Sequence, residues 1–124
     1  MGAGPKLDSV GTIKLVTLDE ALLKLQSIHA LVERMAVEAK GNKPISNLES
    51  QLKRAATPLQ GMLKNQFSLI ADLISSMLLI SGRGTPGSQK VRAYREMVGQ
   101  LKTQLEIAII QVKAKHEVKE EAHE

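Results

Sequence analysis

The sequence contains no cysteine and no tryptophan, and only one phenylalanine and one tyrosine in 124 residues. The absence of cysteine excludes disulfide bonds and metal sites built from thiolates. The scarcity of aromatic side chains argues against a surface on which nucleic acid bases or sugars stack. A hydrophobic core must therefore be built from Leu, Ile, Val, Met and Ala, which are residue types that favour packed helices.

Long apolar runs are also missing. No stretch approaches the roughly 18 apolar residues that cross a membrane, so we expect no transmembrane span. The first six residues lack the apolar region of a secretory signal peptide, and we expect a protein inside the cell, in the cytoplasm or the nucleus. With 43% hydrophobic and 24% charged residues, the composition is that of one globular domain.

Three stretches have apolar residues three and four positions apart, which predicts amphipathic helices. The first is predicted to begin at Thr17, because Thr17-Leu18-Asp19-Glu20 has the pattern of a capping box, and to end before Gly41. Residues 1–16 precede this start and hold three glycines and a proline. We therefore expect a flexible or extended segment over residues 1–16.

The second predicted helix begins at Ser46, where Ser46-Asn47-Leu48-Glu49 forms another capping box, and its apolar spacing continues to Ile80. Pro58 lies inside it. A proline removes one backbone hydrogen bond and clashes with the carbonyl group four residues earlier. The apolar spacing continues past Pro58, which favours a kinked and nearly continuous helix over a break.

The third predicted helix covers about residues 88–118, after a loop over residues 81–88 that holds three glycines and a proline. Its apolar residues recur from Val91 to Val112. The sequence thus predicts an all-α protein, an antiparallel three-helix bundle over residues 17–118, followed by a frayed charged tail over residues 119–124. If Pro58 breaks the second helix, the bundle has four helices.

Charge is distributed unevenly along the chain. The net charge is +4, but the segment from Lys40 to Arg95 holds nine basic residues and only two acidic ones. A positive field of this kind favours acidic partner helices, phosphorylated segments, anionic lipid or nucleic acid. No recognition-helix pattern accompanies it, which argues against nucleic acid as the partner.

Patterns of catalytic or metal-binding residues are absent from the sequence. No glycine-rich phosphate loop and no metal-spaced histidine pair occurs, so we expect neither an enzyme nor a cofactor or metal ion. His29 stands on or beside the apolar face of the first helix, where we expect it to be half-buried. Histidine phosphotransfer proteins are helical bundles that carry a phosphorylated histidine on a helix, so His29 suggests that function as an alternative.

The leading functional hypothesis is a protein–protein interaction domain. The second helix is apolar on two flanks after residue 62, and the third has a widened apolar stripe near its end. We predict an apolar groove between these two helices with a basic rim, which would bind an amphipathic helix with acidic flanks. The predicted partner-binding residues are Lys64, Arg92, Arg95, Gln100, Ile107 and Ile110.

The layout also resembles a BAG domain, a three-helix co-chaperone module. The resemblance spans residues ~18–112 and is carried by the helix lengths, by Asn65-Gln66-Phe67-Ser68-Leu69-Ile70, and by Arg92 with Gln100 eight positions later. It implies binding to the nucleotide-binding lobe of a heat-shock chaperone of the seventy-kilodalton class, with Arg92 and Gln100 in contact with it. The acidic residues that the family has on its second helix fall on Asn65 and Ser75 in this chain.

Overall fold

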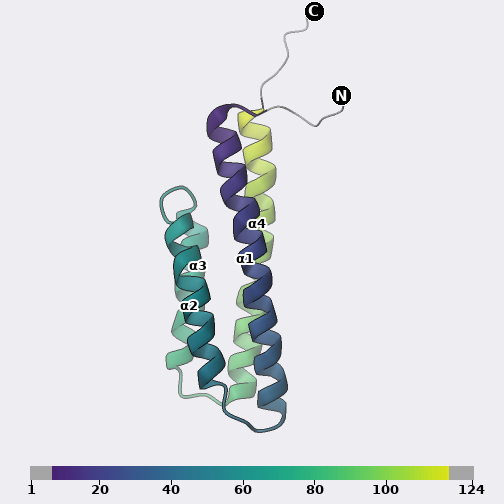
Figure 1. The fold of residues 1–124 in the computed structure, drawn as a ribbon, viewed down its shortest axis with the longest axis vertical. Helices are drawn as coiled ribbons and strands as arrows, with labels where there is room; N and C mark the ends of the chain where they lie inside the picture. Colours follow the sequence, from purple (N-terminus) through teal and green to yellow (C-terminus); the bar gives the residue numbers. More distant parts are fainter. Residues whose placement is uncertain (1–6, 118–124) are drawn as a thin grey trace, which may run out of the picture.

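The computed structural model describes residues 7–117, which form helices and contain no strand beyond an isolated bridge between Leu7 and Glu117. The chain direction alternates from one helix to the next (Figure 1). This arrangement confirms the all-α prediction and has four α-helices. The elements are α1 (Ser9–Lys40), α2 (Ser46–Leu63), α3 (Ser68–Leu78), the short 3₁₀ helix η1 (Leu79–Gly82) and α4 (Gly87–His116).

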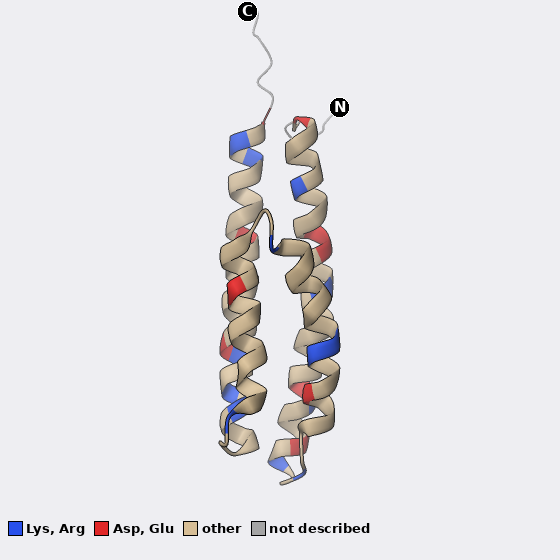
Figure 2. Cartoon of the chain, turned by 90° about the vertical axis from the view of Figure 1, so that its left-hand side faces the viewer, with Lys and Arg blue, Asp and Glu red and all other residues tan. Residues whose placement is uncertain are grey.

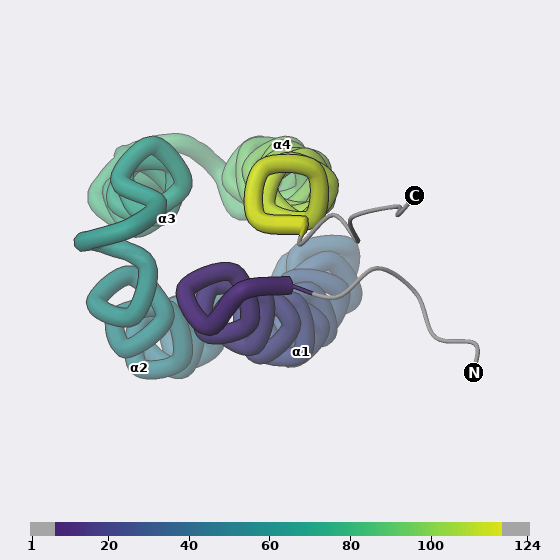
Figure 3. The backbone as a smooth tube through the Cα atoms, turned by 90° about the horizontal axis from the view of Figure 1, so that it is seen from above, coloured from purple at the N-terminus to yellow at the C-terminus, as the bar shows by residue number. Residues whose placement is uncertain are grey.

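Viewed along the long axis, the four helices occupy the corners of a square in the order α1, α2, α3, α4 (Figure 3). Each helix therefore contacts the two that neighbour it in this order. The core between them is aliphatic, as the composition predicts, with Tyr94 as its largest fully buried side chain. Fully or almost fully buried members include Leu18, Ile28, Met35, Leu52, Leu59, Leu63, Ile74, Met77, Ile80, Leu101 and Leu105.

The helices differ greatly in length. α1 has 32 residues and α4 has 30, whereas α2 has 18 and α3 with η1 is shorter still. At about 1.5 Å per residue, α1 is about 21 Å longer than α2. The α2–α3 hairpin therefore covers only one half of the α1–α4 pair (Figure 1). We call the first twelve residues of α1, 9–20, and the last ten of α4, 107–116, the two-helix arm.

The predicted start of the first helix at Thr17 is wrong, because α1 already begins at Ser9. Asp8 is its N-cap, and the carboxylate of Asp8 accepts a hydrogen bond from the backbone N–H of Gly11 at 2.7 Å. The Thr17 hydroxyl caps nothing and instead donates to the carbonyl oxygen of Ile13, one turn earlier. Residues 9–16 are thus helical rather than extended, while residues 1–6 lie outside the described part of the chain.

Gly11 explains why this start resembles a loop in the sequence. Gly11 is buried against α4, and a Cβ atom at this position would overlap with the Cβ atom of His116. The backbone N–H of Asp8 also donates to the carbonyl oxygen of His116 at 3.0 Å. The glycine therefore permits a close approach of the two helix ends, which the helical propensity of the segment does not reveal.

The second predicted helix is interrupted, but not at Pro58. α2 runs through Pro58, which is exposed, and ends at Leu63. The chain then reverses over residues 64–67, and α3 starts at Ser68. The single helix predicted up to Ile80 is therefore wrong. Reversal lets the strongly apolar α3 pack against both α2 and α4, so that Ile70, Ile74 and Met77 are buried.

The last predicted helix is confirmed closely, since α4 spans Gly87–His116. Seven of its residues are buried at the predicted alternating spacing, from Val91 to Val112. The expected end at Val118 and the expected tail over residues 119–124 lie outside the described residues.

Candidate interaction surfaces

One polar cluster is buried in the bundle, at the base of the hairpin half. The hydroxyl of Tyr94 in α4 donates to the Glu49 carboxylate of α2 at 2.6 Å, and Lys90 lies 3.4 Å from the same carboxylate. Lys90 also donates to the backbone carbonyl oxygen of Ser81 at 3.0 Å. Burial, and next the neighbouring Glu49 carboxylate, raise the pKa of Tyr94 far above its usual value. The cluster connects α2, α4 and η1.

The Glu49 side chain therefore does not complete the predicted capping box at Ser46. α2 does begin at Ser46, but Ile45 is its N-cap and no side chain caps it. Glu49 is 8% exposed and turns inward to Tyr94 instead. The single tyrosine within an apolar stripe is the sequence signal that points to this contact, because a buried hydroxyl needs a hydrogen-bond partner.

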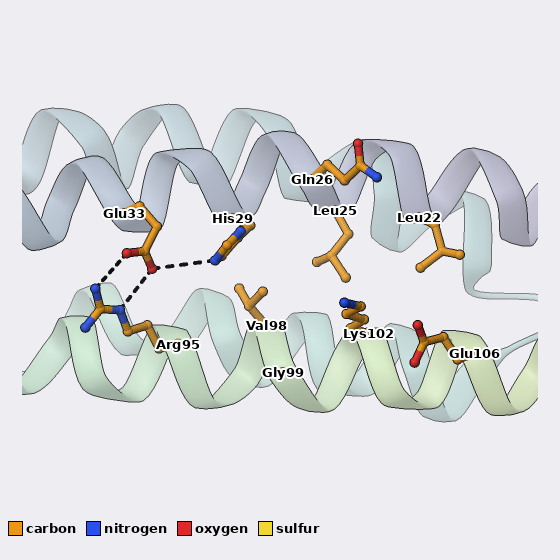
Figure 4. Close-up of a pocket in the computed structure, with 10 residues that line it drawn as sticks. All are labelled: Leu22, Leu25, Gln26, His29, Glu33, Arg95, Val98, Gly99, Lys102 and Glu106. Atoms are coloured by element: carbon orange, nitrogen blue, oxygen red, sulfur yellow. Dashed lines mark hydrogen bonds and ion pairs between the residues drawn. The ribbon is translucent and has the colours of Figure 1, made fainter.

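A first groove, of about 500 Å³, lies between α1 and α4 (Figure 4). Leu22, Leu25 and Val98 give it an apolar floor, and Gly99 lies in its α4 wall. One histidine and charged side chains of both signs surround this floor. They are His29 and Glu33 of α1 with Arg95, Lys102 and Glu106 of α4.

An ion pair closes one end of this α1–α4 groove. The guanidinium group of Arg95 donates two hydrogen bonds to the Glu33 carboxylate, at 2.7 and 2.9 Å. This contact lowers the pKa of Glu33 and raises the pKa of Arg95. His29 lies 3.6 Å from the same carboxylate. Arg95, which we expected on the rim of a groove between the second and third predicted helices, therefore joins α1 to α4 instead.

A second hollow, of about 840 Å³ and more open, lies between α3 and α4. Leu69 and Leu73 of α3 form its apolar side. Leu69 is 79% exposed, the largest exposed fraction among the large hydrophobic side chains of residues 7–117. The α4 side is formed by Glu96, Gly99, Gln100, Thr103 and Gln104.

The position of this hollow agrees with the groove that the sequence predicts, but its rim does not. Of the predicted residues, only Gln100 lines it. Lys64 and Arg92 are exposed and line neither groove, and Arg95 belongs to the α1–α4 groove. The expected basic rim is therefore wrong, because Glu96 is the one charged residue in the lining. Lysine and arginine residues are scattered over the bundle, with acidic residues between them (Figure 2).

Ile107 and Ile110 lie further along α4, on the two-helix arm, and are 39% and 66% exposed. They follow Thr103 at steps of four and three residues, so they share one face of α4 with it. The face of α4 that lines the α3–α4 hollow thus continues along the arm, where it becomes apolar.

Gly99 is a residue whose role the sequence analysis missed. It lines both grooves, and a Cβ atom at this position would meet no other atom within 4 Å. A glycine inside a helix costs about 1 kcal/mol relative to alanine. No contact within the described chain requires it. A glycine in the middle of a long apolar-periodic helix is the signal that could have drawn attention to this surface.

His29 is more exposed than we predicted, with 57% of its side chain accessible in the α1–α4 groove. The expectation of a half-buried packing residue is wrong, because Ile28 and Val32 occupy the buried face of α1 there.

The described residues contain no group of three or more His, Asp or Glu side chains that could hold a metal ion. Within the same part of the chain, no helix combines the length and hydropathy that crossing a membrane requires.

Comparison with known proteins gives no match, since no family model, no curated protein and no solved structure resembles this chain significantly. The residues that carry the BAG resemblance have defined positions. Asn65 to Phe67 lie in the reversal between α2 and α3 rather than inside a helix, while Arg92 and Gln100 are exposed on α4. The co-chaperone hypothesis stays a prediction that rests on these residues.

Proposed function

We propose that this protein is a non-enzymatic interaction module that binds an amphipathic α-helix of another protein in the α3–α4 hollow. The observation that supports this function is the exposed Leu69 beside Leu73 at the edge of an open hollow. A helix lying there would cover both leucines with its apolar stripe, a common mode of peptide recognition.

The opposite wall of the hollow favours close approach of a helix. Gly99 and Thr103 are small, so the backbone of a bound helix can come near α4. Gln100 and Gln104 offer amide groups that donate and accept hydrogen bonds at the edge. Because Glu96 is the charged residue of the lining, the bound helix carries a basic or neutral flank there, rather than the acidic flank that the sequence favoured.

Affinity in this arrangement comes mainly from the leucines. Burying a leucine side chain contributes about 1.5–3 kcal/mol, which corresponds to roughly a tenfold to hundredfold change in affinity. Leu69 is the better test residue of the two, since it is exposed and its substitution leaves the core intact.

The test uses a phage-displayed library of amphipathic helical peptides, selected on the full chain. We expect enriched peptides with apolar residues at three- and four-residue spacing, and at least about tenfold weaker binding to the Leu69→Glu variant. The matched control is Leu79→Glu, at a leucine of η1 that is 73% exposed and lines neither groove.

Two results would overturn the proposal. One is the absence of any enriched peptide that distinguishes the wild type from Leu69→Glu. The other is equal loss of binding in Leu79→Glu, which would show adhesion to any exposed leucine. Calorimetry measures the affinities, and far-UV circular dichroism of each variant verifies that the helices remain.

A further inference from the structure

Two threonines of this chain stand directly before a proline, and the structure places them in different surroundings. Thr57 lies inside α2, where its hydroxyl donates a hydrogen bond to the backbone carbonyl oxygen of Lys53 at 2.8 Å. Thr85 belongs to the loop of residues 83–86, which joins η1 at the end of α3 to the start of α4 (Figure 1). The first Thr-Pro pair is therefore held in a helix, and the second is not.

The loop around Thr85 is exposed and extended. Every residue from 83 to 86 is exposed to solvent. The backbone is extended at both Arg83 and Pro86. A residue that precedes a proline is itself biased toward extended conformations. The loop thus presents a threonine hydroxyl on an accessible, extended segment.

Of the two threonines, Thr85 is the one whose conformation suits a protein kinase. Phosphoryl transfer to a hydroxyl requires its oxygen to lie in line with the transferred group. Protein kinases reach this geometry by binding an extended segment, and the proline-directed class requires a proline directly after the modified residue. Thr57 could be bound in this way only if α2 unwound locally. We propose that Thr85 is a phosphorylation site for a proline-directed protein kinase.

The modification transfers the γ-phosphoryl group of ATP to the Oγ1 atom of Thr85. A bond forms between this oxygen and the γ-phosphorus, and the bond between that phosphorus and the bridging oxygen of ATP breaks. ADP leaves with the electron pair, and a carboxylate of the kinase accepts the hydroxyl proton. The product is a phosphate monoester with a charge of about −2 at neutral pH.

The surroundings of Thr85 favour a negative charge. The first turn of α4 contains no acidic residue, and its N-cap, Pro86, makes no side-chain hydrogen bond to the first backbone N–H groups. Arg83 is exposed two positions before Thr85. A phosphate near a helix N-terminus and an arginine gains charge-assisted hydrogen bonds. Phosphorylation therefore stabilises the junction between η1 and α4 instead of unfolding it.

The first test incubates the full chain with a cyclin-dependent kinase, ATP and Mg²⁺, and locates the phosphoryl group by peptide mass spectrometry. We expect modification at Thr85 to be at least about tenfold faster than at Thr57, because α2 opens only rarely. Thr85→Ala and Pro86→Ala should abolish the modification of the loop, whereas Thr57→Ala should leave it unchanged. Far-UV circular dichroism of each variant verifies that the helices remain.

The second test compares the melting temperatures of the phosphorylated and unphosphorylated chains. We expect phosphorylation to raise the melting temperature by about 2–4 °C. Arg83→Gln should still be phosphorylated but should gain less, because it lacks the guanidinium group that pairs with the phosphate. The matched control is Arg54→Gln, at an exposed arginine of α2, which should gain as much as the wild type.

Two results of the first test would overturn the proposal: a wild-type chain that is not modified at Thr85, and equal rates of modification at Thr57 and Thr85. A melting temperature that stays unchanged or falls on phosphorylation would overturn the stabilising role of the phosphate. The loop lines neither groove, so phosphorylation should leave peptide binding in the α3–α4 hollow unchanged. Either proposal can therefore fail while the other stands.

Discussion

The hairpin half and the two-helix arm contain the same two helices in different surroundings. In the hairpin half, α1 and α4 contact α2 and α3 and bury a continuous aliphatic core with one polar cluster. In the arm, α1 and α4 still bury Leu18, Ala108 and Val112, but five of their large hydrophobic side chains are exposed. The comparison teaches that the amphipathic spacing fixes a buried face along the whole of each long helix, while apolar side chains beside that face stay exposed where the hairpin ends.

The largest effect on stability is expected from a substitution in the core of the hairpin half. Leu59→Ala in α2 removes a side chain that is 1% exposed, and we expect a loss of about 2–5 kcal/mol in the free energy of unfolding. Leu18→Ala removes the same atoms from α1 in the arm. We expect a smaller loss there, since fewer helices surround the cavity and the site can relax more easily. Urea unfolding of both variants measures the difference.

A larger loss for Leu18→Ala than for Leu59→Ala would contradict the view of the arm as the weaker region. Exchange of backbone amide hydrogens in the wild type provides an independent measure. Amides of residues 9–20 should exchange faster than those of residues 25–36 if the arm opens separately.

A smaller effect is expected at the buried cluster that connects α2 to α4. Tyr94→Phe keeps the ring in the core but removes the hydrogen bond to the Glu49 carboxylate. We expect a loss of about 1.5–3 kcal/mol, the range for a hydrogen bond to a charged group. Thermal or urea unfolding at neutral pH measures it.

The control for the cluster replaces all three side chains, because Lys90 also pairs with Glu49. In the triple variant Glu49→Leu, Lys90→Met and Tyr94→Phe, no buried charge lacks its partner, so stability should recover relative to Tyr94→Phe alone. A triple variant that loses the sum of the three single effects would show that the contacts within the cluster contribute little.

The smallest expected effect is at the tip of the arm. The N–H of Gly11, and also His116, lower the pKa of the Asp8 carboxyl. A carboxyl group with a lowered pKa in the folded state stabilises the fold above its unfolded pKa, and this contribution disappears as the pH falls through the folded value. The melting temperature of Asp8→Ala should therefore be slightly below that of the wild type at pH 7.

The same difference should vanish well below about pH 4, where Asp8 is protonated in both states. Asp19→Ala, which removes an exposed carboxylate of the same helix away from its start, serves as the control. A melting-temperature difference for Asp8→Ala that persists unchanged at acidic pH would contradict the assignment of Asp8 as a charged N-cap.

Only a small part of the candidate site could be predicted from the sequence, and the failures have physical causes. The apolar excess of the second predicted helix and of α4 pointed to a groove between them, and the α3–α4 hollow lies there. Its rim was not predictable, because the partner of Arg95 is Glu33, which is 62 positions away in the sequence. Gln100 lies in the hollow, whereas Ile107 and Ile110 lie beyond it on the arm.

The sequence by itself determined the helical class and, for α4, both the buried face and the extent of the helix. These features follow from the three- and four-residue spacing of aliphatic residues, which is local information. Tertiary structure decided the rest. The chain reverses after Leu63 because only a folded-back α3 can bury Ile74 and Met77 against both neighbours. Likewise, α1 extends back to Ser9 because α4 lies alongside it and Gly11 lets the two approach.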